Sequence, residues 1–328
     1  MKRRQFITLI AGTVAAWPLS PLLAQVPHKR PVLVWLSGLT QTAGRYSVAA
    51  FLKGMRELGY AEGSDFDLLY RFSDGYADRI PSLAEEVVRL KPDIILATAV
   101  DTAVAVRKLT STIPIVTGAL ADPVELGLIA SEARPAGNVT GIEPYVAGLP
   151  AKQLELAREI VPGMRKVGLL TNLQDPKAPP QAQELTTAAK ALEVEIATAD
   201  ANRPEEIESA LHALATQRVD IVIVLQTTML LSERDQIIAW ELANKLPMVF
   251  GYPQYTRAGG LVSYGVDLPW CFYRTAYFVD KILRGTAPGD LPVEFPSKML
   301  LAVNIKTAKA LGLTVPSSLL FRADEVIE

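Results

Sequence analysis

Polar side chains that can form hydrogen bonds gather where the short apolar runs of this sequence end. The runs have the length and composition of buried strands, and Ser, Thr, Asn, Gln and Asp follow them. The set comprises Ser37, Thr40, Thr98, Asp101, Thr102, Asp122, Thr171, Asn172, Gln226 and Thr227. Because ligands of open α/β sheets bind beyond the carboxyl ends of the strands, this set predicts a site for a small molecule.

The sequence lacks the common signatures of catalysis. It holds no nucleophile elbow G-x-S-x-G, no phosphate loop G-x-x-x-x-G-K-[ST] and no dinucleotide motif G-x-G-x-x-G. A single cysteine, Cys271, and two histidines, His28 and His212, have no partners at metal-ligand or triad spacing. A carboxylate pair stays open, but no pair is singled out. We therefore expect a binding protein and not an enzyme, without metal or cofactor.

Some of these polar residues have a structural alternative. The segment from Thr98 to Thr102 leads into a helix, whose free N–H groups would attract a carboxylate. Equally, Asp101 or Thr102 would cap that helix. Asp122 and Asp267 would accept hydrogen bonds from an ammonium or hydroxyl group, or would cap the helices that they precede.

Three tyrosines fall in a region expected between two lobes. Tyr252, Tyr255 and Tyr264 would sandwich a planar or apolar ligand with their rings. The alternative for each of them is packing at the edge of a lobe.

Strand and helix patterns alternate along the chain. Strands are expected at 31–36, 66–71, 93–98, 113–117, 138–141, 166–171, 193–197, 220–225, 247–251 and 261–265. Helices are expected at 46–58, 80–90, 101–109, 149–160, 182–192, 204–216, 233–245, 273–284 and 305–311. This alternation predicts an α/β protein with doubly wound parallel sheets. The likeness of 91–98 to 218–227 favours two similar lobes, and the last 75 residues would cross back between them.

The stretch from Ile113 to Gly141 holds one further expected helix. After the strand at 113–117, Asp122-Pro123 has the pattern of a helix start, with a capping acid and a proline in the first turn. That helix would end at Arg134, and 138–141 would leave the unit as a strand.

Composition and the first residues indicate an exported protein. The chain has 328 residues, 49% of them hydrophobic, and a net charge of −2, with no basic tract that would favour nucleic acid. Residues 1–24 are typical of a signal peptide, and Arg3-Arg4 resembles a twin-arginine motif, with an ordinary secretory leader as the alternative. There is no cysteine near Ala24 to which a lipid anchor could be attached. We expect a soluble, unanchored protein of the bacterial periplasm.

Several segments together resemble one family. They are Gly54–Tyr60, Thr110–Val116, Asp122–Val124, Arg134–Gly141, Ala258–Gly265, Val279–Gly285, Asp290–Val293, Asn304–Leu313 and Ala323–Ile327. The sequence is similar in them to the periplasmic substrate-binding components of ABC transporters, in the family that includes the binders of tryptophan and other aromatic amino acids. The resemblance covers nearly the whole chain after the leader. The loop at 97–102 departs from the family pattern at Val100 and Asp101, so the resemblance does not assign the ligand.

The resemblance implies a type I periplasmic-binding fold, with two lobes, three crossovers and a ligand clamped between the lobes. Lobe 1 is expected at 30–141 plus 266–292, and lobe 2 at 142–265 plus 293–328. The family's ligand-side positions correspond to Ser37, Thr98–Thr102, Asp122, Asn172, Gln226, Tyr252 and Asp267.

The function implied is capture of an amino acid or another organic carboxylate by lobe closure, followed by delivery to an ABC permease in the inner membrane. We expect a monomer with a small-molecule ligand and no nucleic-acid partner. Two alternatives stay open. One is an exported sensor module that feeds a membrane receptor, and the less favoured one is a periplasmic enzyme on the same scaffold.

Overall fold

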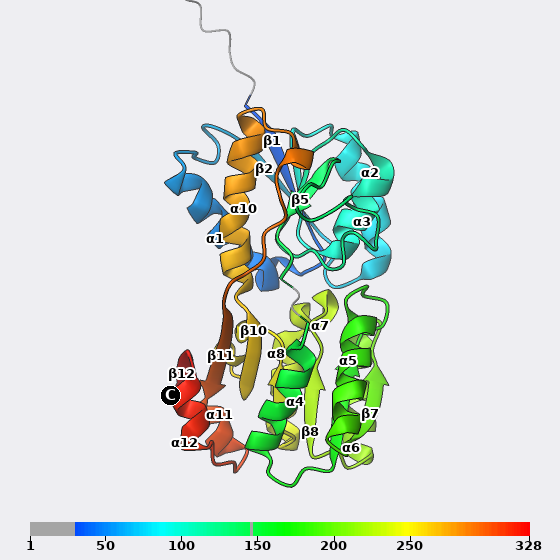
Figure 1. Ribbon diagram of the computed structural model, residues 1–328, viewed down its shortest axis with the longest axis vertical. Coiled ribbons are helices and arrows are strands. Elements are labelled where there is room, and N and C mark those ends of the chain that lie inside the picture. Colours follow the sequence, from blue (N-terminus) through cyan, green and yellow to red (C-terminus); the bar gives the residue numbers. More distant parts are fainter. Residues whose placement is uncertain (1–29, 145–146) are drawn as a thin grey trace, which may run out of the picture.

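The structure, a computed structural model, describes residues 30–144 and 147–328. The chain forms two α/β lobes, which lie one above the other in Figure 1. The expected signal peptide at 1–24 lies outside the described residues. None of the helices within the described ranges has both the length and the apolar character that a membrane span requires.

The first lobe contains a parallel sheet in the order β2-β1-β3-β4-β5. Its strands are β1 (Val32–Ser37), β2 (Asp67–Phe72), β3 (Ile94–Ala97), β4 (Ile115–Thr117) and β5 (Val139–Gly141). Its helices are α1 (Gln41–Glu57), α2 (Ile80–Arg89) and α3 (Val100–Leu109), with a 3₁₀ turn, η1 (Ala77–Arg79), before α2. The run Leu33–Leu36 is continuously apolar because β1 lies inside the sheet and both of its faces are covered.

The second lobe contains a larger sheet in the order β12-β11-β10-β9-β8-β6-β7. The strands are β6 (Lys166–Thr171), β7 (Glu195–Asp200), β8 (Ile221–Val224), β9 (Met248–Phe250), β10 (Val262–Val266), β11 (Met299–Asn304) and β12 (Glu325–Ile327). All neighbouring strands are parallel except β10 and β11, which are antiparallel. The prediction of two α/β lobes with doubly wound parallel sheets is confirmed, and the one antiparallel pair arises where the chain returns from the first lobe to form β11.

The helices of the second lobe include short ones that the periodicity of the sequence does not reveal. The helices are α4 (Leu149–Ile160), α5 (Ala178–Ala191), α6 (Ile207–Thr216), α7 (Thr228–Ser232), α8 (Arg234–Asn244), α9 (Pro253–Arg257), α11 (Ile305–Ala310) and α12 (Ser317–Arg322), with the 3₁₀ turn η2 (Pro204–Glu206). Helices α7 and α9 have five residues each, too few to show a repeating apolar stripe.

The two sheets share a local feature: a residue with positive φ, followed two residues later by an aspartate that hydrogen-bonds to a neighbouring strand. Lys91 and Arg218 both adopt a positive φ, of 49° and 54°, just before β3 and β8. Two residues later, Asp93 accepts a hydrogen bond from Val32 N (2.7 Å), and Asp220 accepts one from Lys166 N (2.9 Å). Each carboxylate thus binds the first strand of its own sheet, and the sheets share the order 2-1-3-4-5 through β5 and β10. The likeness of the two halves therefore extends from sequence to topology.

The chain passes between the lobes three times. It leaves the first sheet after β5, and after β10 it returns as α10 (Leu268–Leu283), which packs along α1 in the upper lobe of Figure 1. After the 3₁₀ turn η3 (Pro288–Asp290) it descends again to β11. Since α10 begins where β10 ends, one crossover joins a helix of one lobe to a strand of the other.

The helix expected after Asp122 does not form. Residues 122–129 make hydrogen-bonded turns, in which the N–H groups of Leu126 and Leu128 bond to Asp122 O and Pro123 O. Asp122 has a φ of +44°, whereas a helix cap requires an extended backbone, and Gly127 at +66° ends the turn. The capping pattern at Asp122-Pro123 therefore starts only one turn.

We predict that Gly54→Val destabilises the protein by about 1–3 kcal/mol, because a Cβ at Gly54 would lie 2.5 Å from Tyr273 O and 2.7 Å from Ala276 Cβ on α10. Urea unfolding measures this change. Gly137→Ala is the control, because its nearest neighbour, Pro135 O, lies 3.9 Å from the new Cβ. Equal stability of the Gly54 variant and the native protein would contradict the close packing of α1 on α10.

Candidate ligand-binding site

The carboxyl ends of the two sheets face each other, and the lobes are in contact across the cleft. Thr40 N, at the start of α1, donates to Ser232 Oγ at the end of α7 (3.0 Å). Arg203 of the second lobe forms an ion pair with Asp78 of the first, at 2.8 Å. The structure therefore describes a closed arrangement of the lobes.

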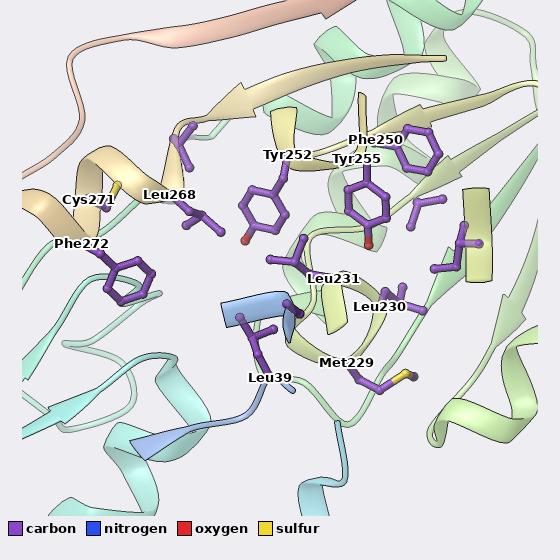
Figure 2. Packing of buried hydrophobic residues seen from close by; sticks show 14 of the residues in the cluster. Leu39, Met229, Leu230, Leu231, Phe250, Tyr252, Tyr255, Leu268, Cys271 and Phe272 are labelled. Atoms are coloured by element: carbon purple, nitrogen blue, oxygen red, sulfur yellow. The ribbon is translucent and has the colours of Figure 1, made fainter. Parts of the chain in front are cut away.

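Apolar side chains from both lobes meet in the centre of this cleft. Figure 2 shows Leu39, which precedes α1, and Leu268 and Phe272 of α10 close to Leu231 of α7 and to Tyr252. They enclose a cavity of about 20 Å³, which we call the deep cavity. It is lined by Leu39, Thr98, Ala99, Ala119, Lys177, Thr227, Thr228, Leu231, Tyr252, Leu268 and Phe272. This volume suits one water molecule or one small polar group.

A second cavity, of about 240 Å³, adjoins the first at Thr228. We call it the outer cavity. It is lined by Gly38, Ser73, Gly75, Ala77, Ile80, Pro81, Asp101, Val104, Ala105, Lys108, Asn172, Gln174, Asp175, Pro176, Thr228 and Met229. Its walls come from both lobes, because α2 and α3 face the loop that follows β6. A ligand that filled both cavities would touch both lobes.

Lys177 carries the buried positive charge of the site. Burial by itself lowers the pKa of this ammonium group, but the negative charge of Asp175 in the first place, and that of Asp101, outweigh this effect and raise the pKa above its ordinary value. Its Nζ lies 3.7 Å from Asp175 Oδ2 and 3.4 Å from Thr228 Oγ1. Both distances are long for a charged hydrogen bond, so the ammonium is charged but only loosely paired.

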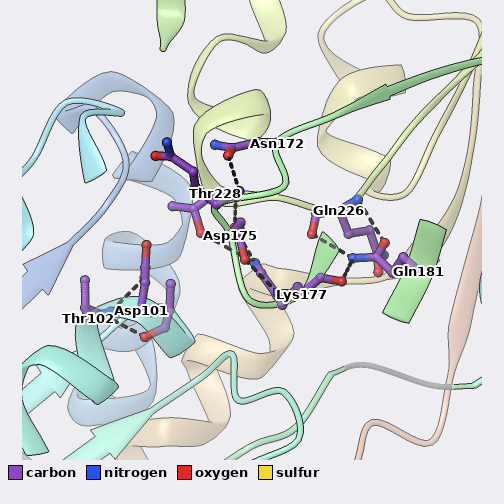
Figure 3. A network of polar contacts seen from close by, with 10 residues as sticks. Asp101, Thr102, Asn172, Asp175, Lys177, Gln181, Gln226 and Thr228 are labelled. Atoms are coloured by element: carbon purple, nitrogen blue, oxygen red, sulfur yellow. Dashed lines mark hydrogen bonds and ion pairs between the residues drawn. The ribbon is translucent and has the colours of Figure 1, made fainter. Parts of the chain in front are cut away.

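Asp175 is occupied by the backbone. Its Oδ1 accepts from Lys177 N (3.0 Å) and its Oδ2 from Thr228 N (2.8 Å), as Figure 3 shows. The carboxylate therefore ties the loop after β6 to the first residue of α7. Asp175 therefore has two roles: its hydrogen bonds fix the backbone at Lys177, and its charge compensates the Lys177 ammonium.

Hydroxyl groups surround the Lys177 ammonium. The Tyr252 side chain lines the same cavity as Lys177, and burial chiefly raises the pKa of this phenol, which stays neutral. Thr227 Oγ1 is buried and has no partner among the described residues. Lys177, Tyr252, Thr227 and Thr228 thus present donors to the deep cavity, as binding of an oxyanion requires.

Asp101 lies on the opposite lobe, in the wall of the outer cavity. Its Oδ1 accepts from Thr102 N at 2.7 Å. Burial, and then the negative charge of Asp175, raises the pKa of Asp101 to about 6, although Lys177 acts in the opposite direction. A cationic ligand group beside Asp101 would relieve this repulsion.

The structure brings five of the predicted site residues to the two cavities. Thr98, Thr227 and Tyr252 line the deep cavity, and Asp101 and Asn172 line the outer one. Behind them, Ser37 is buried and accepts a hydrogen bond from Thr98 Oγ1, at 3.0 Å. It therefore supports Thr98 instead of lining a cavity.

Three other predicted residues, Thr102, Thr40 and Gln226, have structural roles. Thr102 Oγ1 exchanges hydrogen bonds with the backbone of Ala99, at 3.1 and 2.7 Å, so the capping alternative describes it. Thr40 caps α1 through Ala43 N, at 3.1 Å. Gln226 Nε2 donates to Gly251 O at 2.6 Å, and its side chain lies against that glycine.

Three more predicted residues lie away from both cavities. Asp267 Oδ1 accepts from Arg257 Nη1 (3.1 Å) on the outside of the cleft. Tyr264 packs against a hydrophobic cluster of the second lobe. Asp122 lies in its turn, where its N–H donates to Glu143 Oε1 (2.9 Å).

Tyr255, the third of the tyrosines expected between the lobes, packs against another ring and lines neither cavity. Its ring stacks on Phe250 with the centroids 4.5 Å apart.

The sequence reasoning missed Lys177, Asp175 and Thr228. One signal was available, because Lys177 directly precedes α5, where the helix dipole disfavours a cation unless an anion is near. Within the described residues, no group of three or more His, Cys, Asp and Glu side chains is arranged to hold a metal ion.

We predict that Asp101→Asn flattens the pH dependence of stability between about pH 4 and pH 6. The folded protein keeps the Asp101 proton up to about pH 6, whereas the ordinary value is 3.8, so the free energy of unfolding falls as pH rises through this window. The variant should be more stable than the native protein at pH 7, by about 1–3 kcal/mol. Urea unfolding from pH 4 to pH 7 measures this, with exposed Glu85→Gln as the control. Parallel profiles of the native protein and the Asp101 variant would contradict the burial of Asp101 as a carboxylate.

Known proteins resemble the chain along most of its length. A curated relative, the tyrosine-binding protein of Clostridioides difficile (strain R20291), is 27% identical over 263 residues, which are 80% of this chain and 75% of the relative. A structure of a conserved domain protein from Vibrio cholerae is 27% identical, with a TM-score of 0.84 over 91% of this chain and 100% of that one.

A third relative is the structure of an ABC domain from Streptococcus pneumonia in complex with L-Trp. It is 23% identical, with a TM-score of 0.83 over 91% of this chain and 100% of that one, and it shares the fold. The profile of the family described as ABC transporter substrate binding protein matches residues 37–327. Since this match spans most of the chain, the protein belongs to the family of ABC transporter substrate-binding proteins.

Proposed function

We propose that the protein is the solute-binding component of an ABC importer and that it captures an amino acid or a closely related organic carboxylate. The observation that carries the proposal is the buried, loosely paired ammonium of Lys177, which has hydroxyl groups around it at the meeting point of the two lobes. A buried charge is costly unless it is paired, so the site favours an anion from outside the chain.

The carboxylate of the ligand would enter the deep cavity. One oxygen would accept from Lys177 Nζ, and the hydroxyls of Thr227 and Tyr252 are placed to donate to the same group. The volume of about 20 Å³ admits a single small group, so the rest of the ligand would extend into the outer cavity.

The outer cavity has groups that would bind the ammonium group and the side chain of an amino acid. Asp101 would accept hydrogen bonds from the ammonium group, which would also reduce its repulsion with Asp175. Ile80, Pro81, Val104 and Met229 offer apolar contacts to a side chain. Two relatives, one a tyrosine-binding protein and one a complex with L-Trp, support an aromatic amino acid as the first ligand to test.

Lobe closure would couple binding to transport. A ligand that contacts both lobes favours the closed form by its differential affinity for that form. In this proposal the lobes are 30–141 plus 266–292 and 142–265 plus 293–328, and the closed protein docks as a monomer on an inner-membrane permease. Export to the periplasm by a signal peptide at 1–24 belongs to the same proposal. The family is one of substrate-binding proteins, and we propose no catalytic step.

We predict that L-tyrosine or L-tryptophan raises the melting temperature of the protein and that Lys177→Met weakens this binding by about 30-fold or more, equivalent to about 2 kcal/mol. The cause is loss of the charge that pairs with the carboxylate. Isothermal titration calorimetry measures the affinity. Tyramine, which lacks the carboxylate, should bind weakly to the native protein and equally weakly to the variant.

Lys190→Met is the matched control, since Lys190 is an exposed lysine of α5, the helix that directly follows Lys177. It should bind as the native protein does. Stabilisation of the native protein only by sugars or metal ions, or undiminished binding by the Lys177 variant, would contradict the proposal.

A further inference from the structure

A large groove lies outside the two cavities, and three of its nine lining residues are arginines. We call it the arginine groove. It has a volume of about 680 Å³ and is lined by Thr42, Arg45, Tyr46, Arg234, Asp235, Gln254, Arg257, Ala258 and Pro269. None of these residues lines the deep or the outer cavity. Its walls belong to both lobes, because α1 faces α8 and α9 across it.

Arg234 is the unusual residue of the groove. It is only 5% exposed, and it is the first residue of α8, an eleven-residue helix whose dipole disfavours a cation there. Its carboxylate contact is Asp235, through Nε at 3.3 Å, and that side chain is 71% exposed. Across residues 30–144 and 147–328, nothing accepts a hydrogen bond from its two Nη groups.

Arg45 faces the groove from the other lobe. Its guanidinium stacks over the Tyr46 ring, 4.6 Å from the centroid, and Nη2 donates to the Tyr46 hydroxyl at 2.7 Å. It has no carboxylate partner within the described residues. The groove therefore sets two guanidinium groups, one from each lobe, against the single exposed carboxylate of Asp235.

The third arginine, Arg257, is already paired with two carboxylates. Arg257 donates from Nε and Nη2 to Glu325, at 2.9 and 2.5 Å, and from Nη1 to Asp267, at 3.1 Å. It forms part of the wall without a free donor pair. The open positions are consequently the Nη fork of Arg234 and the guanidinium of Arg45.

We propose that the arginine groove is a second binding site, for a small oxyanion of the phosphate or carboxylate class. The planar fork of Arg234 matches the two oxygens of such a group, and an anion there compensates a buried cation that the chain leaves nearly unpaired. Arg45 completes the site from the opposite lobe. An anion held by both side chains bridges the lobes, so its binding favours the closed form of the protein.

The test is isothermal titration calorimetry of the mature protein with inorganic phosphate and, separately, with succinate, at constant ionic strength set by chloride. We expect saturable binding of at least one of them. Arg234→Gln should weaken it by about tenfold or more, and Arg45→Gln should weaken it as well. Arg89→Gln, an exposed position on α2 away from the groove, should bind as the native protein does. The preferred anion distinguishes a phosphate from a carboxylate site.

Absence of saturable binding of both anions, or equal affinity in the native protein and the Arg45 variant, overturns the proposal. The Arg45 variant keeps the test valid if the buried Arg234 variant fails to fold. Small-angle scattering tests the bridging role, since the bound anion should reduce the radius of gyration without any amino acid present. An unchanged radius overturns that role. Binding of tyrosine or tryptophan is measured separately, so failure here leaves the proposed function untouched.

Discussion

The hydrogen bonds that Asp175 accepts from two backbone N–H groups are the interaction on which the site depends. They join the loop after β6 to the start of α7, two segments that follow different strands of the second sheet. They thereby hold Lys177 at the deep cavity, where its ammonium has only long contacts, to Asp175 and Thr228. Without this carboxylate, Lys177 would be a buried charge at a helix N-terminus, a position that both burial and the helix dipole disfavour.

The apolar contacts across the cleft explain why this charge acts in a closed form. Leu39 and Phe272 meet Leu231 and Tyr252 around the deep cavity, so water is excluded from the ammonium and its hydroxyl neighbours (Figure 2). Electrostatic attraction is stronger in such surroundings than in water. On the other lobe, burial of Asp101 in the wall of the outer cavity raises its pKa, and its interactions with Asp175 and Lys177 couple the two charged sides of the site. Selectivity for a zwitterion would follow from this arrangement more than from its apolar walls.

Local patterns in the sequence were sufficient for most of the architecture. We could recognise β1 and β8 from their continuous apolar runs and α1 from its helical stripe, because burial dictates the composition of these elements. The expected helix after Asp122 fails since a positive φ at that residue is not visible in a capping pattern. Similarly, the antiparallel β11 follows from a long return of the chain, which local periodicity does not encode. The sequence predicted which edge of the sheets holds the site but not which side chains line it. Thr98, Asp101 and Tyr252 line the cavities. In contrast, Gln226 donates to Gly251 O, and Asp267 pairs with Arg257.

Binding of a ligand carboxylate at Lys177 is the central feature of the proposed site, and a crystal structure of the protein with the ligand that it retains on purification tests this most directly. We predict an oxygen of a ligand carboxylate about 2.7–2.9 Å from Lys177 Nζ, within the deep cavity, and an ammonium group beside Asp101. A bound ligand without a carboxylate, or one whose carboxylate lies away from Lys177, would contradict the account.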